Sequence, residues 1–309
     1  MARRRRPVEG CEEPLVQLFR GLSGFSLTPT DAEGQVQADL LGRLVQRIQA
    51  AGVDSLGLLG STGGYAYLTL AERQRAVRVA VEAVGGHLPI IVGVGALRTD
   101  EALALARDAR KAGADGLLLA PVSYTPLTQE EAFQHIAAVA EAGELPLCIY
   151  NNPGTTKFIF GEDLIARLTR VPNIAAIKMP LPADGDFAGE LARLRARTPD
   201  GFAIGYSGDW GAADALLAGG DAWYSVVAGL LPVPALKLLR AAQAGEAAEV
   251  RRLDAAFQPL WQLFREFGSF RVMYVIAELL GLGRLEPPRP ILPLSGEVRP
   301  RVEAALQGL

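Results

Sequence analysis

The chain has 309 residues, of which 50% are hydrophobic, and it carries a formal net charge of −3. This charge is too small and too mixed in sign to indicate a nucleic-acid partner, and no apolar run reaches the roughly 18 residues that a membrane span requires. The hydrophobic content is ample for one large core, and the length also fits a single α/β barrel.

The first 17 residues are predicted to form a basic, disordered tail. Arginines at positions 3–6 are followed by glutamates at 9, 12 and 13, where a secretory signal would need an apolar segment. A basic contact arm is the alternative interpretation. The only cysteines, Cys11 and Cys148, do not indicate a disulfide framework, so the cytoplasm is the expected compartment.

Two kinds of strand start alternate along the chain. In segments 50–60, 111–121 and 217–227, a helix ends at glycine and an aspartate precedes an apolar run. In segments 87–95 and 144–152, a proline opens the strand instead. Each step from one strand to the next is about thirty residues, the length of one βα unit.

The predicted strands are short and apolar on both faces, which is typical of buried parallel strands. We predict eight of them, near residues 25–28, 55–59, 90–94, 116–119, 146–150, 174–178, 201–206 and 222–226. Segments with helical spacing of apolar residues lie between them, at 38–51, 70–84, 100–112, 128–142 and 162–169.

Eight alternating units predict a (β/α)8 TIM barrel over residues 18–230. An open doubly wound sheet is the alternative, but no G-x-G-x-x-G fingerprint supports it. Residues 231–309 contain successive helical patterns and a proline-rich strap. We therefore predict a C-terminal helical extension that packs on the barrel.

Catalytic groups of such barrels lie at the carboxyl ends of the strands, where the sequence places an unusual lysine. The apolar stretch "IAAI" is followed by Lys178, one of only four lysines in the chain. A lysine at a strand tip can simply extend to solvent. Alternatively, a desolvated lysine supplies a neutral amine that attacks a carbonyl, which arginine cannot do.

Two further features lie at strand ends. The stretch "GSTGG" presents the Ser61 and Thr62 hydroxyls and small-residue backbone that suit a carboxylate, although an ordinary glycine-rich turn would look the same. Tyr150 offers a phenol for proton transfer, with an amphipathic rim tyrosine as the alternative. Together with Lys178, these groups predict a site for a 2-oxo acid, with the carboxylate at the turn and the carbonyl at the amine.

The stretches "GSTGGYAYLTLAER", "YNNPGTT", "IAAIKMP" and "GYSGDW" resemble, in order and spacing, motifs of a known family. The chain resembles the dihydrodipicolinate synthase / N-acetylneuraminate lyase family of pyruvate-dependent class I aldolases over about residues 18–300. The resemblance implies a TIM barrel, a covalent lysine imine with the substrate, no metal or organic cofactor, and a homotetramer or homodimer.

The resemblance also implies roles for single residues. Lys178 would form the imine, and Tyr150 would be the acid/base. Ser61 and Thr62 would bind the substrate carboxylate, and the Ser61 hydroxyl would join a proton relay. Tyr124 would be the second tyrosine of that relay, which a neighbouring subunit often supplies. Tyr224 would line the pocket beside the imine.

Two positions depart from the family pattern. Gly64 stands where the family has glutamate, and Thr155, expected to contact the second substrate, stands where the synthases have an arginine for its carboxylate. The favoured hypothesis is therefore a Schiff-base lyase of pyruvate or another 2-oxo acid, closer to branches that act on sugar-derived acids. The alternatives are a 4-hydroxy-tetrahydrodipicolinate synthase, which condenses pyruvate with aspartate semialdehyde, and a catalytically silent 2-oxo-acid-binding barrel.

Overall fold

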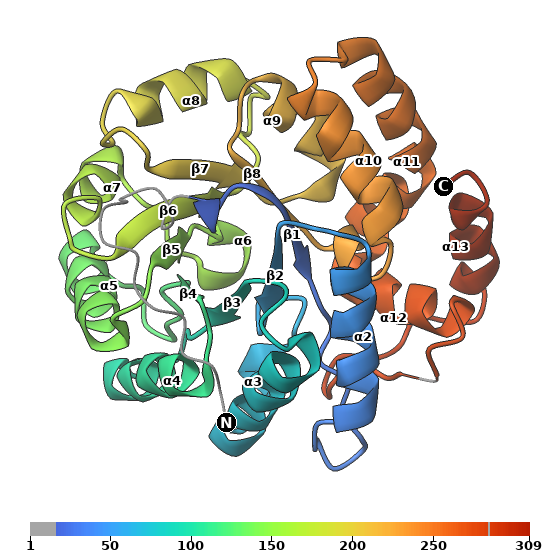
Figure 1. Cartoon of the computed structure of the whole chain (residues 1–309), viewed down its shortest axis with the longest axis horizontal. Coiled ribbons are helices and arrows are strands. Elements are labelled where there is room, and N and C mark those ends of the chain that lie inside the picture. The colour runs from blue at the N-terminus through green and yellow to red at the C-terminus, as the bar shows by residue number, and fades with distance from the viewer. Residues whose placement is uncertain (1–16, 284) are drawn as a thin grey trace.

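The computed structural model describes residues 17–283 and 285–309, and it shows a closed barrel of parallel strands in sequential order (Figure 1). The predicted tail over residues 1–17 lies almost entirely outside the described residues. The strands are β1 (Gly21–Phe25), β2 (Ser55–Leu58), β3 (Ile90–Gly93), β4 (Gly116–Leu119), β5 (Leu147–Tyr150), β6 (Ile174–Met179), β7 (Ala203–Tyr206) and β8 (Ala222–Ser225). The predicted (β/α)8 TIM barrel is confirmed.

Helices connect the strands and form a ring around the barrel (Figure 1). They are α2 (Ala38–Ala50), α3 (Leu70–Val84), α4 (Thr99–Ala112), α5 (Gln129–Gly143), α6 (Pro153–Thr156), α7 (Glu162–Leu168), α8 (Phe187–Arg195) and α9 (Ala212–Leu217), with single turns η1 (Tyr65–Tyr67), η2 (Asp209–Gly211) and η3 (Val227–Gly229). In the described part of the chain, none of the helices combines the length and apolarity needed to span a bilayer.

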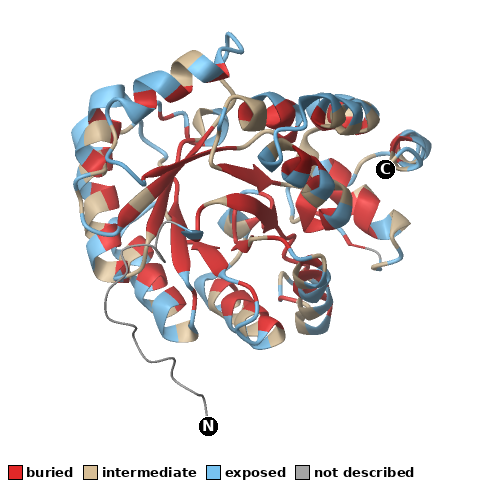
Figure 2. Ribbon diagram, turned by 45° about the horizontal axis from the view of Figure 1, so that its top comes forward, coloured by how far each residue is buried: buried red, intermediate tan, exposed pale blue. Residues whose placement is uncertain are grey.

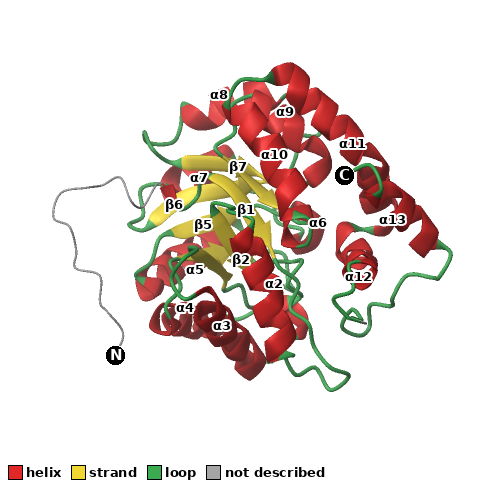
Figure 3. Cartoon of the chain, turned by 45° about the vertical axis from the view of Figure 1, so that its right-hand side comes forward, coloured by secondary structure: helices red, strands yellow, loops and turns green. Residues whose placement is uncertain are grey.

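The C-terminal region is helical, as predicted, and lies to one side of the barrel (Figure 3). It consists of α10 (Pro232–Gln243), α11 (Ala247–Phe267), α12 (Ser269–Leu279) and α13 (Val298–Leu306). Helix α10 follows β8 after the single turn η3 and packs against β1 as well as α11, so it joins the barrel to the later helices. The division of the chain at residue 230 stays a prediction.

Strand β1 lies earlier than predicted. It covers Gly21–Phe25 instead of residues near 25–28, and its residues pair with β2 on one side and β8 on the other. The sequence "GLSGF" contains two glycines and a serine, which have low strand propensity and conceal the strand from pattern analysis. The backbone N–H groups of Gly21 and Leu22 bond to acceptors near neighbouring strands, and these contacts fix the strand start.

The barrel separates two apolar cores. Figure 2 shows that the strands between them are buried along most of their length. The larger core lies between the strands and the surrounding helices, and it continues into the C-terminal helices. The smaller core fills the barrel interior with side chains such as Phe25, Cys148, Tyr150 and Tyr224. Because both faces of every strand are covered, each strand is apolar on both faces, which explains the sequence pattern.

The aspartates that precede alternate strands have a common structural role. Each accepts a hydrogen bond from the backbone N–H of the preceding strand: Asp54 from Leu22 (2.7 Å), Asp115 from Ile90 (2.9 Å) and Asp221 from Ile204 (2.8 Å). Each aspartate thereby satisfies a buried backbone donor that lies at the amino end of the barrel.

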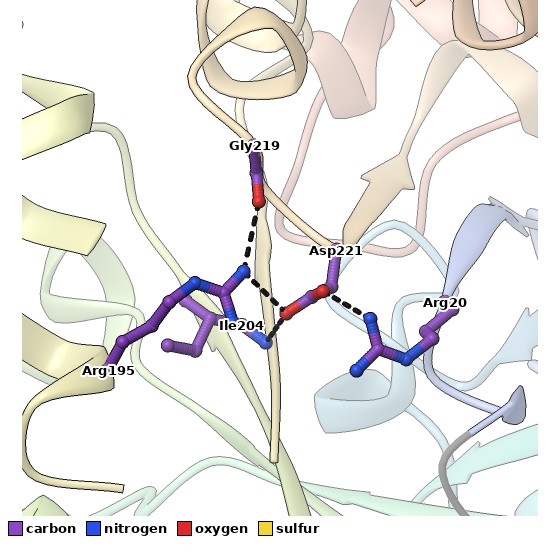
Figure 4. A network of polar contacts seen from close by, with 5 residues as sticks. All are labelled: Arg20, Arg195, Ile204, Gly219 and Asp221. Atoms are coloured by element: carbon purple, nitrogen blue, oxygen red, sulfur yellow. Dashed lines mark hydrogen bonds and ion pairs between the residues drawn. The ribbon is translucent and has the colours of Figure 1, made fainter. Parts of the chain in front are cut away.

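Asp221 also holds two guanidinium groups (Figure 4). Arg20, just before β1, donates to one carboxylate oxygen, while Arg195 of α8 donates to the other at 3.1 Å and to the Gly219 carbonyl at 3.0 Å. The carboxylate therefore ties β1, β7, β8 and α8 together where the barrel closes. This network lies at the end of the strands opposite to Lys178.

The turn after β2 is seated by an unusually close backbone contact. Leu59 adopts a left-handed conformation with φ of 56°, and its carbonyl points at Gly93. A Cβ atom at Gly93 would lie 1.9 Å from the Leu59 carbonyl oxygen, so only glycine fits there. The position of the following Ser61–Thr62 turn depends on this contact.

Gly93→Ala is expected to destabilise the protein by about 2–4 kcal/mol, because the backbone of Leu59 must move out of its close-packed position. Gly296→Ala is the matched control, since no heavy atom lies within 4 Å of a Cβ atom there. Urea unfolding followed by circular dichroism measures both. Equal stability of the two variants would contradict the structural role of Gly93.

Candidate active site

A cavity of about 700 Å³ lies at the carboxyl ends of the strands. Its walls come from three regions: the loops after β2 and β5–β8, the end of β6, and the junction of α11 with α12. The residues that line it are Ser61, Thr62, Tyr150, Asn152–Thr155, Lys178, Pro180–Ala183, Ser207–Trp210, Val226, Phe264 and Gly268–Phe270.

Lys178 lies at the inner end of this cavity and is buried, with 4% of its surface exposed. The strand register pairs it with Tyr150 of β5. Its Nζ lies 3.9 Å from the centroid of the Phe25 ring, 4.2 Å from that of Tyr150 and 5.6 Å from that of Tyr224. Among the described residues, no ion pair involves Lys178.

Burial lowers the pKa of Lys178 from 10.5 to about 7, because removal from water disfavours the ammonium form. Electrostatic interactions with Cys148 and Asp209 oppose this shift but do not cancel it. The rings around Nζ also favour the cation, yet desolvation dominates. At neutral pH a large fraction of the amine is therefore neutral and nucleophilic.

Tyr150 is buried, and burial raises the pKa of its phenol to about 12. Its oxygen accepts a hydrogen bond of 3.0 Å from the Asn152 side-chain amide, which also donates to the Ser61 hydroxyl at 3.4 Å. The Ser61 hydroxyl interacts with the phenol and partly opposes the rise of its pKa. Tyr150, Asn152 and Ser61 thus form one connected polar group at the inner end of the cavity.

The turn after β2 brings Ser61 and Thr62 to the cavity wall, as the sequence predicts. Thr62 is buried and Ser61 is exposed. Gly63 packs against the Leu59 backbone, where a Cβ atom would approach within 2.9 Å, and Gly64 has a left-handed φ of 62°. The close approach requires glycine at position 63, and the left-handed backbone favours glycine at position 64.

The other predicted site residues differ in their placement. Thr155 lines the cavity and is exposed at its outer part. Tyr224 is 1% exposed and lies in the barrel interior, where its phenol is 3.5 Å from the Cys148 thiol. Tyr124 is 96% exposed and is not among the cavity residues of this chain. The structure therefore brings Lys178, Tyr150, Ser61, Thr62 and Thr155 to one cavity.

Several site residues escaped the sequence analysis. Asn152 connects Tyr150 to Ser61, and its position next to Tyr150 in "YNNP" was the only signal. Phe25 packs against the amine from the strand that was misplaced. Phe270 reaches the cavity from the C-terminal helices, and no local pattern marks such a long-range contact.

Asp209 is a buried carboxylate in the cavity wall that also escaped the sequence analysis. It accepts hydrogen bonds from the Trp223 indole (2.9 Å) and from the backbone N–H groups of Val226 (3.2 Å) and Val227 (2.7 Å). Burial raises its pKa, and these bonds oppose that rise. Asp209 thereby fixes the loop after β8 against the loop after β7.

The fold and the site define a class of enzyme: the (β/α)8-barrel lyases of class I, which work through a Schiff base. Comparison with known families agrees with this class. The sequence model of the Dihydrodipicolinate synthetase family matches residues 18–309, and the chain belongs to this family. Enzymes of the family work through a lysine Schiff base and use no metal cofactor.

Related proteins match over nearly the whole chain. The chain is 36% identical over 293 residues to the 4-hydroxy-tetrahydrodipicolinate synthase of Alcanivorax borkumensis, covering 94% of this chain and 97% of the relative. It is similar in structure to a dihydrodipicolinate synthase from Agrobacterium tumefaciens (TM-score 0.94, 63% identity, 96% and 99% coverage). It is also similar to the chloride-inhibited dihydrodipicolinate synthase of Acinetobacter baumannii complexed with pyruvate (TM-score 0.84, 29% identity, 94% and 98% coverage).

Lys178→Met is expected to stabilise the protein, and the gain should depend on pH. Between pH 7 and 10.5 the unfolded chain binds a proton that the folded amine lacks, so wild-type stability rises with pH in this window. The amount by which Lys178→Met raises the free energy of unfolding should therefore shrink by about 3 kcal/mol between pH 7 and 9.5. Urea unfolding at both pH values measures it.

Lys111→Met, at an exposed lysine, is the matched control and should show no such pH dependence. An advantage of Lys178→Met that stays constant from pH 7 to 9.5 would show that the pKa of Lys178 is not lowered.

Proposed function

We propose that Lys178, Tyr150, Ser61 and Thr62 carry out the lyase reaction on pyruvate or a related 2-oxo acid. The observation that carries this proposal is the position of the Lys178 amine, which is buried beside the Tyr150 phenol at the inner end of the cavity. Burial there lowers the pKa of the amine. The pyruvate complex of the Acinetobacter relative supports pyruvate as the keto acid.

The proposed reaction begins when the Lys178 amine attacks the keto carbon and water leaves as the imine forms. The imine withdraws electrons from the adjacent carbon, so that a proton can leave the methyl group and give an enamine. Tyr150 moves this proton, and its contacts with Asn152 and Ser61 hold the phenol in place. The same groups support C–C cleavage, in which the enamine is released from a larger 2-oxo acid, or dehydration of such an acid.

The Ser61–Thr62 turn is the proposed site of the substrate carboxylate. It lies at the same end of the cavity as Lys178, and its hydroxyl groups and backbone N–H groups are suitable donors. An anion held there presents its keto carbon to the amine. Tyr224 lies in the barrel interior with its ring near the Lys178 amine and, in this proposal, limits the depth to which the substrate enters.

The competing function is 4-hydroxy-tetrahydrodipicolinate synthesis, for which the names of the curated relatives are the supporting observation. Against it, Thr155 offers a hydroxyl where the synthases' motif has arginine, so the second substrate's carboxylate lacks a bidentate partner. A coupled reductase assay with aspartate semialdehyde distinguishes the two functions.

Incubation with pyruvate and borohydride is expected to add the reduced pyruvate group to the Lys178 peptide, as measured by mass spectrometry. Lys178→Arg should give no adduct, because the guanidinium stays protonated. Tyr150→Phe should still form the adduct but turn over about 10²–10⁴-fold more slowly, since only proton transfer is lost.

An adduct on another lysine would refute the assignment of Lys178. An adduct on Lys178 without any turnover would favour the catalytically silent binding protein. Normal turnover in Tyr150→Phe would remove Tyr150 from the mechanism.

We also propose a cytoplasmic homo-oligomer, either a dimer or a tetramer. In its support, the loops after β3 and β4 expose large apolar side chains at the same end of the barrel, with Leu97 64% and Tyr124 96% exposed. Such side chains are typical of contacts between copies of a chain. This arrangement would let Tyr124 enter the neighbouring site.

Sedimentation equilibrium is expected to give two or four times the mass of one chain, and Tyr124→Ala should lower turnover while borohydride trapping persists. A fully active monomer would contradict both the assembly and the role of Tyr124. Tyr67→Ala, at another exposed tyrosine, is the matched control for loss of a surface ring.

A further inference from the structure

The cavity has two chemically different halves. The inner half contains the polar groups of Lys178, Tyr150 and the Ser61–Thr62 turn. The outer half has large apolar side chains from separate parts of the chain: Leu181 after β6, Trp210 of η2, Phe264 of α11 and Phe270 of α12. The hydroxyl groups of Thr155, Ser207 and Ser269 complete the lining. The mechanism proposed above uses only the inner half, which leaves the outer wall without a role.

No cationic side chain lines the outer half. Among the residues that line the cavity, only Lys178 and Asp209 are ionisable apart from the phenol of Tyr150. Lys178 is committed to the imine, while Asp209 is an acid whose oxygens already accept hydrogen bonds from Trp223, Val226 and Val227. An anionic group in this half would lose part of its hydration with no cation among the lining residues to replace it, which is unfavourable.

Two exposed cations lie at the edge of the cavity, next to lining residues Gly154 and Gly268, and each donates to a backbone carbonyl. The Lys157 ammonium donates to the Gly154 carbonyl at 2.9 Å, and the Arg271 guanidinium donates to that of Phe267 at 3.5 Å. Both side chains are exposed and neither lines the cavity.

An aromatic ring also lies against the turn that carries Ser61. A Cβ atom at Gly64 would lie 3.6 Å from the Phe270 ring and 3.8 Å from Pro288. Thus the position where the family motif has glutamate is here a glycine packed against apolar groups. Phe270 has an intermediate exposure, so part of its ring remains accessible.

We propose that the outer half binds the body of a neutral, apolar aldehyde, so that the enzyme joins such an aldehyde to pyruvate or cleaves the resulting 4-hydroxy-2-oxo acid. This inference rests on the proposed imine chemistry at Lys178. A cavity of 700 Å³ falls within the range of about 300–1,000 Å³ typical of sites for ligands much larger than pyruvate.

The reaction balances without a further reactant. The pyruvate methyl carbon loses a proton to the Tyr150 relay and bonds to the aldehyde carbon, whose oxygen then takes up a proton. The water released when the imine forms is consumed when the imine is hydrolysed. The product is the sum of pyruvate and the aldehyde.

The test compares three aldehydes with pyruvate as the common partner: phenylacetaldehyde, glyceraldehyde and aspartate semialdehyde. Mass spectrometry measures initial rates of product formation, counting also the cyclised product of the last aldehyde. We expect kcat/KM for phenylacetaldehyde to exceed that for aspartate semialdehyde by about 100-fold or more. Equal or faster use of aspartate semialdehyde, or a preference for glyceraldehyde, would overturn the inference.

Phe270→Ser provides a second measurement. It should raise KM for phenylacetaldehyde about 10-fold or more and leave KM for glyceraldehyde nearly unchanged, because only the apolar body touches the ring. Ile159→Ser is the matched control, since Ile159 is 71% exposed and lies outside the cavity. An equal effect of Phe270→Ser on both aldehydes would indicate a structural role and would overturn the assignment.

Borohydride trapping with pyruvate accompanies each assay and tests the imine mechanism separately from the class of aldehyde substrate. An adduct on Lys178 without a preference for phenylacetaldehyde overturns only the substrate class. The absence of an adduct in the wild-type protein overturns both the imine mechanism and the inference that rests on it.

Discussion

The site depends on keeping water away from the Lys178 amine, which has no carboxylate partner among the residues that the structure describes. Each unit of the lowered pKa of Lys178 corresponds to about 1.4 kcal/mol against the ammonium form. The rings of Phe25 and Tyr150, 3.9 and 4.2 Å from Nζ, are at once the source of the desolvation and a weak attraction for the cation. The barrel tolerates this cost because two separate apolar cores stabilise the strand that carries the lysine.

Two of the rings around the amine, those of Phe25 and Tyr224, explain three glycines in or directly after the strands. A Cβ atom at Gly57 or at Gly60 would lie 2.6 Å from the Phe25 ring, and one at Gly205 would lie 2.6 Å from the Tyr224 ring. Glycine in a strand usually weakens it, and it is found where another group must approach closely. Here the rings beneath the amine occupy that space, so the low strand propensity of these segments follows from the construction of the site.

The sequence predicted the fold because alternating strand starts have local causes: aspartates that accept from the preceding strand, and prolines tolerated at the first strand residue. The sequence also predicted that Lys178, Tyr150 and the Ser61–Thr62 turn lie close together, because barrel topology brings the carboxyl ends of the strands to one end of the molecule. It misplaced β1, whose glycines are explained only by contacts with distant residues. It also missed Asp209 and Phe270, because each acts through partners that become neighbours only on folding.

The two halves of the cavity have different structural origins, which bears on how specificity arises in this fold. The amine and the phenol lie within the strands β6 and β5, and their geometry is fixed by hydrogen-bonded register. The outer wall comes from loops and from the junction of α11 with α12, which pack on the barrel without belonging to the sheet. Side chains there can change without moving the lysine. A barrel of this design can therefore retain the imine chemistry while the C-terminal helices determine which aldehyde reaches it.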